Sequence, residues 1–178
     1  DFADLDCKAG KIPCGSDKLI TLPHFMGRRT PIANPLAKGV IFGLTPNHTR
    51  FHIYRSLLES VAYGFREGFD SIRDRVTRIV VAGGGAKSFI WRQIASEVLD
   101  HPVEYSTKGG TSLGIAYLVG YSLGIYKDFE ELRETWSPTH DIHWPDKKHV
   151  NRYEDLYQIY LKLGRNIEQL YQDLHYIS

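Results

Sequence analysis

Residues 79–88 read Ile-Val-Val-Ala-Gly-Gly-Gly-Ala-Lys-Ser, and an apolar helical pattern follows them as far as Leu99. Four small apolar residues, three glycines and then a helix indicate a buried strand, a tight turn and a helix N-terminus. Proteins of the α/β class use this arrangement to bring bare backbone up to a nucleotide or a phosphate. A plain strand-to-helix turn has the same pattern, so both interpretations stand on this stretch alone.

The segments on the C-terminal side of this stretch continue the alternation of strand and helix. The sequence predicts strands over residues 77–82 and 102–106 and helices over residues 87–99 and 111–124. Strands that alternate with helices in this way form a parallel sheet with right-handed crossover connections. The predicted fold class is therefore α/β, with a core over residues 45–126.

Residues 1–44 are a lead-in that is rich in predicted loops. Residues 1–18 are polar and show no sustained period, whereas residues 19–22 and 39–44 are short extended candidates. The stretch between these two candidates is a long loop by its glycine and proline content.

A long helix is predicted to begin at Thr45, whose hydroxyl would cap it, with Pro46 in the first helical position. Apolar side chains then recur at steps of three and four along one predicted packing stripe, at Phe51, Tyr54, Leu58, Val61, Phe65, Phe69 and Ile72. Gly64 and Gly68 each lower helix propensity by roughly 1 kcal/mol relative to alanine. We therefore expect a neighbouring element to pack closely against these two glycines.

The C-terminal part is predicted to contain one irregular region and one helix. Residues 128–148 are irregular, with a short helix around residues 129–134, and a last helix covers residues 149–176 with tyrosines that cap the core edges. Three long helices but only two clear strands after residue 75 leave the sheet short. Either the lead-in strands complete the sheet, or part of it precedes Asp1; we favour the second explanation.

The composition is ordinary for a globular protein, with 42% hydrophobic residues, 24% charged residues and a net charge of +1. This balance gives no reason to expect a nucleic acid or an anionic membrane as a partner. No apolar run approaches the roughly 20 residues of a membrane span, and the acidic N-terminus is unlike a signal peptide. We expect a cytoplasmic protein, and the missing initiator methionine suggests a start within a longer chain.

Cysteine and histidine spacings argue against a metal centre. Cys7 and Cys14 lack a second pair, so free thiols are expected; a disulfide fits their number but not a cytosolic chain. His48 and His52 lie four residues apart without the glutamate of the HExxH zinc motif. We expect these histidines to lie on a helix surface or to bind a loop, and no metal ligand is predicted.

Two common phosphate-binding motifs are excluded at the glycine turn. The Walker A motif requires glycine at the positions of Val81 and Ala86, and both glycines are absent. The dinucleotide-binding motif GxGxxG requires glycine at the position of Ser88.

Several motifs, in the correct order, nevertheless resemble one family. The run Gly-Val-Ile-Phe-Gly-Leu at residues 39–44, followed seven residues later by His-Ile-Tyr-Arg-Ser-Leu-Leu-Glu at residues 52–59, closely matches the C-terminal signature of the FGGY carbohydrate kinases. Further motifs resemble the xylulose-kinase branch of that family, at residues 22–27, 29–31, 83–88, 91–93, 113–116 and 124–126. The resemblance extends from about Gly15 to Tyr126.

The resemblance implies an actin-like, ribonuclease-H-like ATPase fold with two domains, of which residues 1–178 form the single C-terminal, nucleotide-binding domain. Such kinases phosphorylate a sugar hydroxyl with MgATP. The general-base aspartate, most sugar contacts and the early phosphate-binding hairpins are then expected upstream of Asp1, together with the first strands of this domain. The chain would have no catalytic residue of its own and would be inactive in isolation.

By similarity, the turn formed by Gly83, Gly84 and Gly85 lies against the adenine and ribose of ATP, and Ser88 hydrogen-bonds the base. An adenine ring needs flat backbone and apolar neighbours, and Gly84 offers a peptide face where a side chain would collide. For Lys87 we favour a solvated position over a nucleotide contact. The resemblance implies ATP and Mg²⁺ as the cofactors.

Two positions depart from the family pattern. Many members have Gly-Glu-Arg-Thr-Pro where residues 27–31 read Gly-Arg-Arg-Thr-Pro, and Asp-Pro where this chain has Asn34-Pro35. These changes place the substrate in doubt, although they leave the glycine turn unaffected.

The leading hypothesis is a kinase for a ketopentose such as xylulose. The alternative is a non-catalytic member of the same fold that binds nucleotide or sugar as a regulator or pseudokinase, and a partner-binding module with a structural turn is the third. The expected partners are the sugar, MgATP and the N-terminal domain. A homodimer is left open, because the tyrosines of the last helix fit a dimer face or packing on the chain's own sheet.

Overall fold

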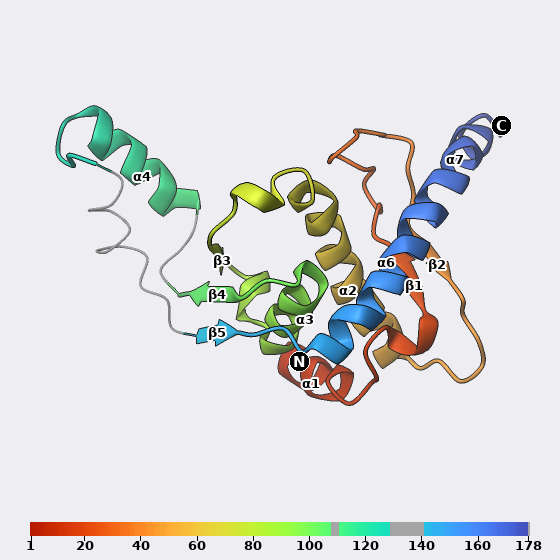
Figure 1. Cartoon of the computed structure of the whole chain (residues 1–178). Coiled ribbons are helices and arrows are strands. Elements are labelled where there is room, and N and C mark those ends of the chain that lie inside the picture. The colour runs from red at the N-terminus through yellow and green to blue at the C-terminus, as the bar shows by residue number, and fades with distance from the viewer. Residues whose placement is uncertain (108–110, 129–140, 178) are drawn as a thin grey trace.

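The computed structural model describes residues 1–107, 111–128 and 141–177 (Figure 1). Its helices are α1 (Phe2–Ala9), α2 (Arg50–Phe69), α3 (Phe89–Leu99), α4 (Thr111–Ser122), α6 (Lys147–Asn166) and α7 (Glu168–His175), and its strands are β1 (Ile20–Leu22), β2 (Val40–Phe42), β3 (Ile79–Ala82), β4 (Val103–Ser106) and β5 (Asp141–His143). The short helix predicted at residues 129–134 lies outside the described residues. No described helix has the length and apolar character to cross a bilayer.

The strands form two separate sheets. β3, β4 and β5 make a three-stranded sheet in that order, and β1 pairs only with β2. β3 and β4 are parallel, as the alternation of strand and helix predicts, with Ile79 opposite Val103. β5 is antiparallel to β4 and lies in the region predicted to be irregular, so that prediction is wrong for Asp141–His143. The lead-in strands do not join β3, which rejects the first of the two explanations for the short sheet.

The lead-in begins with a helix that the sequence pattern did not predict. Asp1 caps α1 by accepting a hydrogen bond from Ala3 N at 3.3 Å, and Lys8 pairs with Asp4 one turn away at 2.8 Å. These local contacts stabilise a helix that is too short to show an apolar period.

Helix α2 begins four residues later than predicted. Thr49, not Thr45, is its N-cap residue, and the His52 ring accepts a hydrogen bond from Thr49 N at 3.1 Å, which completes a capping box. The Thr45 amide instead donates to Nδ1 of His48 at 2.9 Å. The Thr49 hydroxyl in turn accepts a hydrogen bond from Phe51 N at 3.3 Å, so backbone donors at the helix start are satisfied locally, whereas Thr45 and Pro46 lie in the preceding turn.

The buried face of α2 only partly follows the predicted apolar stripe, since Phe69 is buried and Leu58 packs against both hydrophobic clusters but other members of the stripe are exposed. Phe65 is 58% exposed and Val61 is 42% exposed. The face that packs against α1, α3 and β1 instead carries mainly polar and charged side chains, namely His52, Arg55, Ser56, Glu59, Ser60 and Arg66. No heavy atom lies within 4 Å of a Cβ added at Gly64 or Gly68, so the close packing expected there is not found among the described residues.

A fully buried carboxylate at Glu59 is the centre of this polar face. Its oxygens accept hydrogen bonds from Gly15 N at 2.9 Å, Ser16 Oγ at 2.8 Å, Arg55 Nε at 2.9 Å and the Tyr153 hydroxyl at 2.8 Å. Four donors, one of them the Arg55 guanidinium, compensate the cost of removing the charge from water. Glu59 therefore joins the lead-in, α2 and α6 at one point.

Glu59 also holds an unusual piece of backbone. Gly15, Ser16, Asp17 and Lys18 all have positive φ, at 80°, 48°, 52° and 72°. Residues other than glycine rarely adopt this region, so the surroundings must enforce it. The hydrogen bonds from residues 15 and 16 to Glu59 do so on one side, and the His52 ring, 3.1 Å from Asp17 Oδ2, does so on the other.

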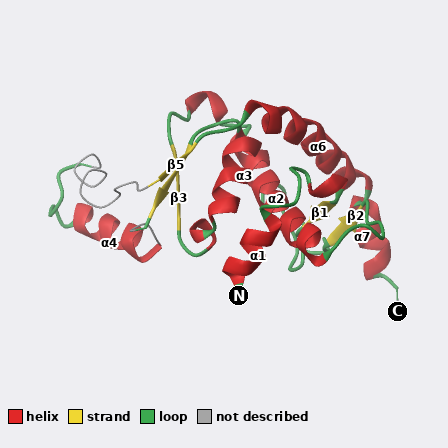
Figure 2. Cartoon of the chain, turned by 90° about the horizontal axis from the view of Figure 1, so that it is seen from below, coloured by secondary structure: helices red, strands yellow, loops and turns green. Residues whose placement is uncertain are grey.

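The predicted last helix is interrupted at Ile167, where α6 ends and α7 begins. Tyr153, Tyr157, Tyr160 and Tyr171 are buried along the two helices, which confirms that the tyrosines belong to the core. Helix α4 stands apart from α1, α2 and α3, beyond the three-stranded sheet (Figure 1, Figure 2), and exposes mainly apolar side chains at Ile115, Leu118 and Val119. Cys7 and Cys14 are free thiols, as predicted.

Candidate functional site

The glycine turn follows β3 directly and leads into α3. Gly83 has φ +88°, a conformation that glycine adopts without strain, and the chain then forms one 3₁₀ turn over Gly85–Lys87. Ser88 is the N-cap residue of α3, and its hydroxyl accepts a hydrogen bond from Trp91 N at 3.2 Å. The helix therefore begins at Phe89 and not at Lys87, because Ser88 has the side chain that caps it.

The backbone of the turn is uncovered. A Cβ built on Gly83, Gly84 or Gly85 would meet no heavy atom of the described residues within 4 Å, apart from its chain neighbours. The side chain of Lys87 is exposed and that of Ser88 is half-buried. The turn thus presents bare peptide groups at the C-terminal end of a parallel strand, which is where open α/β sheets bind ligands.

A cavity of about 530 Å³ borders the turn, and it is mostly apolar. Its walls come from α2, β3, the turn and α3, with Leu58, Val61, Phe65, Val80, Val81, Ala82, Gly85, Ala86 and Trp91. The exposed apolar side chains of α2 therefore line this cavity rather than the core. The indole Nε1 of Trp91 is buried there without a hydrogen-bond partner among the described residues.

On its other side, the turn is bonded to a buried arginine. Nη1 of Arg92 donates to the carbonyl oxygens of Ala86 at 2.7 Å and of Lys87 at 3.2 Å. The guanidinium carbon lies 4.2 Å from the centre of the Tyr105 ring on β4. Arg92 belongs to a quoted family motif, but nothing in the local pattern indicates that its side chain turns back to the glycine turn.

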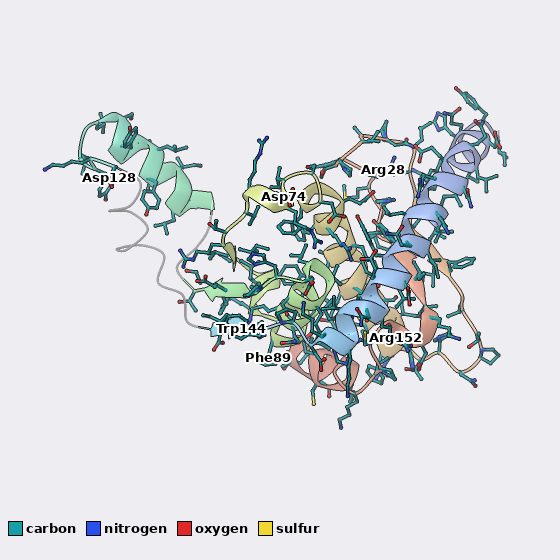
Figure 3. All side chains as sticks on the ribbon, in the orientation of Figure 1. Arg28, Asp74, Phe89, Asp128, Trp144 and Arg152 are labelled. Carbon is teal, nitrogen blue, oxygen red and sulfur yellow. The ribbon has the colours of Figure 1, made fainter. Side chains whose placement is uncertain are left out.

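Arg92 is in turn bonded to β5, the strand that was not predicted. Its Nε donates to Nε2 of His143 at 2.8 Å, and its Nη2 lies 3.4 Å from Oδ2 of Asp141. The Phe89 ring packs against His143 with 4.7 Å between ring centres. Figure 3 labels Phe89 near Trp144, where the start of α3 meets the end of β5.

The contact with Arg92 requires a neutral imidazole, because an Nε2 that accepts a hydrogen bond carries no proton. Burial and the nearby guanidinium lower the pKa of His143, and the carboxylate of Asp141 opposes them in part. His143 is only 4% exposed, so a charge on its ring would be poorly solvated. At neutral pH the side chain is therefore an uncharged acceptor.

Among residues 1–107, 111–128 and 141–177, no cluster of histidine, cysteine, aspartate or glutamate side chains has the arrangement of a metal site. His48 and His52 instead bond to the backbone and to Asp17 around the start of α2. Their role in the structure is to cap the helix and to hold the loop at residues 15–18.

Comparison with known proteins defines the class. The model of the FGGY family of carbohydrate kinases, C-terminal domain, matches residues 3–123, and the chain belongs to this family. A xylulose kinase of Rhodospirillum rubrum has the same fold, with a TM-score of 0.83 and 29% identity over 96% of this chain and 35% of the other. The fold is thus the actin-like, ribonuclease-H-like ATPase fold that the resemblance implied.

Curated relatives carry several activities in their names. The xylulose kinase of Bacillus subtilis is 26% identical over 89% of this chain and 33% of its own length. The gluconokinase of the same species is 32% identical over 93% of this chain and 33% of its own length. The glycerol kinase of Haemophilus influenzae is 35% identical over 78% of this chain and 29% of its own length. The chain therefore spans about a third of the length of the relatives it matches.

Proposed function

We propose that this chain is the nucleotide-binding domain of a carbohydrate kinase, and that the turn Gly83–Gly85 with Ser88 binds the adenosine part of ATP. The observation that carries the proposal is the uncovered backbone of the turn, because no atom of residues 1–107, 111–128 and 141–177 outside the adjoining chain lies within 4 Å of where each glycine Cβ would be. A flat heterocycle can approach such peptide groups, and the hydroxyl of Ser88 is still able to donate a hydrogen bond to it. The family membership of the chain supports the same assignment.

The proposed reaction is the transfer of the γ-phosphoryl group from MgATP to a hydroxyl of a sugar, with a ketopentose such as xylulose as the first candidate. This chemistry asks mainly for positioning and charge stabilisation. The turn would supply the positioning of the nucleotide. The described residues offer no carboxylate cluster for Mg²⁺ and no placed general base, so both functions are assigned to the rest of the polypeptide.

The rest of the polypeptide is also the proposed partner of one face of this domain. β3 is the end strand of its sheet, and its second edge carries no strand among the described residues. Exposed Val80 and the side chains of Val61 and Phe65 lie along the same face. The relatives are about three times as long as this chain, and a polypeptide of that length has further residues that can cover such a surface. Closure of an adjoining domain would exclude water from the phosphates.

The nucleotide site can be tested by calorimetric titration of the complete polypeptide with MgADP. Replacing Gly84→Val adds a branched side chain to the turn, and we expect affinity to fall at least about tenfold, or about 1.4 kcal/mol. Gly68→Val is the matched control, because its added side chain also meets open space but lies on α2 away from the turn. Equal affinities for wild type and Gly84→Val would reject the site.

The reaction needs a separate test, because a non-catalytic member of the fold would also bind MgADP. A coupled assay of the complete polypeptide with ketoses, gluconate and glycerol covers the activities named for the relatives. Turnover with one of these acceptors supports the kinase. Binding of MgADP without turnover on any of them would favour the regulator or pseudokinase instead.

A further inference from the structure

The conformation of the glycine turn depends on few internal hydrogen bonds. Lys87 N donates to Gly84 O at 3.2 Å and Ser88 N donates to Gly85 O at 3.3 Å, and both distances are long for amide hydrogen bonds. The shortest bond to the turn is the one from Arg92 to Ala86 O, at 2.7 Å. A charged donor forms a stronger hydrogen bond than a neutral amide. The guanidinium is therefore the strongest restraint on the C-terminal half of the turn.

Arg92 can act as a restraint only if its own position is determined. The guanidinium carbon lies 4.2 Å from the centre of the Tyr105 ring, and His143 Nε2 accepts a hydrogen bond from Arg92 Nε at 2.8 Å. The Nε–H bond fixes the plane of the guanidinium, which aims Nη1 at the two carbonyls of the turn. Through Arg92, the position of His143 on β5 therefore affects the position of the glycine turn.

We propose that Arg92 is a positioning residue for the nucleotide-binding turn, and that neutral His143 holds Arg92 in the orientation that the turn requires. The proposal rests on the proposed function, because it assumes that the turn binds the nucleotide. His143 is 51 residues away from Arg92 in the sequence. The proposed contribution of His143 to nucleotide affinity acts through its hydrogen bond to Arg92.

Protonation of His143 would remove this support. The titratable and charged groups that face its ring among the described residues are Arg92 on α3 and Asp141 on its own strand. Since the pKa of His143 is lowered in the folded protein, the arrangement is complete above the ordinary histidine value of about 6.5. The arrangement is lost as the pH falls through the pKa of His143 in the folded protein, because the protonated imidazole and the Arg92 guanidinium would then repel each other.

The first experiment measures MgADP affinity of the complete polypeptide between about pH 5 and pH 8. His143→Leu removes the acceptor, and we expect affinity to fall about tenfold to a hundredfold at all pH values. His143→Gln keeps an acceptor that does not titrate, so its affinity should fall less and should not weaken further in acid. Unchanged MgADP affinity in His143→Leu would overturn the role of His143.

The second experiment needs no nucleotide. Hydrogen exchange of peptides that cover residues 83–88 should become faster in Arg92→Lys, while peptides from α6 keep their rates. Arg78→Lys is the matched control, because Arg78 pairs with Glu104 in the same sheet, at the end of β3 opposite the turn. Unchanged exchange of the turn in Arg92→Lys, or equal acceleration throughout the chain, would overturn the positioning role of Arg92.

The two experiments separate the two proposals. If the wild-type polypeptide does not bind MgADP, the proposed function fails, and the exchange rates alone decide whether Arg92 restrains the turn. If MgADP binds and Gly84→Val weakens it, but Arg92→Lys changes neither affinity nor exchange, the nucleotide site stands and the positioning role is rejected.

Discussion

Replacing Glu59→Gln should strongly destabilise the chain. Glu59 is 2% exposed and accepts four hydrogen bonds, and its nearest cation, Arg55, is buried as well. Glutamine keeps the shape of the side chain but leaves the Arg55 charge without a partner. Removing one member of a buried ion pair costs about 3–5 kcal/mol. The new amide N–H₂ can donate to the Ser16 hydroxyl while the remaining oxygen keeps its bonds from Gly15 N, Arg55 Nε and the Tyr153 hydroxyl, so the expected loss comes from the missing negative charge.

A loss of this size is a large part of the 5–15 kcal/mol that stabilises a typical domain. Urea unfolding of wild type and Glu59→Gln, followed by circular dichroism, measures the difference in the free energy of unfolding. Asp4→Asn is the control: its side chain is 54% exposed and pairs with Lys8, which is 42% exposed, and exposed pairs contribute about 1 kcal/mol or less. If Glu59→Gln costs no more than this control, Glu59 does not carry the network.

Two further substitutions test local features of the fold. Lys18 has φ +72°, a conformation that costs a side-chain-bearing residue about 1–2 kcal/mol, and glycine recovers this at a smaller entropic cost in the unfolded chain. Lys18→Gly should therefore raise the free energy of unfolding by about 0.5–1 kcal/mol, and a lower thermal midpoint would contradict the assigned strain. In the wild-type chain, Arg28 Nη2 lies 3.4 Å from Glu168 Oε2. Arg28→Glu replaces this attraction with two adjacent carboxylates and should lower the free energy of unfolding by about 1 kcal/mol. Adding Glu168→Arg should restore stability in a double-mutant cycle, and a coupling energy near zero would show that the pair does not fasten α7.

The same contact explains both departures from the family pattern. Arg28 and Asn34 replace acidic residues of many members, and both side chains bond to Glu168 on α7, Asn34 Nδ2 at 2.7 Å. The Tyr171 hydroxyl also donates to Lys38 O, at 3.0 Å. A basic and a neutral residue thus suit an acidic partner on the C-terminal helix. These changes concern the docking of α7 on the loop, and the glycine turn is on another part of the domain.

Local sequence patterns determined the parts of the fold in which neighbours along the chain supply most of the contacts. The strand at residues 79–82, the glycine turn, the helix to Leu99 and the parallel strand after it were all predicted, because a short apolar run and glycines limit the backbone locally. The spaced motifs also identified the family, which the family model confirms. The role of Gly83–Gly85 and Ser88 in nucleotide binding stays a prediction.

Only the tertiary structure decided which side chains of α2 are buried. The apolar stripe is correct for the buried Phe69 but wrong for the exposed Val61 and Phe65. It also misses Glu59 and Arg55, which satisfy each other and the loop at residues 15–18 in the interior. Charge patterns along one helix cannot reveal donors that come from residues 44 positions away. Likewise β5 is only three residues long, and its main contact, from His143 to Arg92, joins residues that are 51 positions apart in the sequence. Periodicity reports the average polarity of a surface, whereas burial of a charge depends on particular partners that folding brings together.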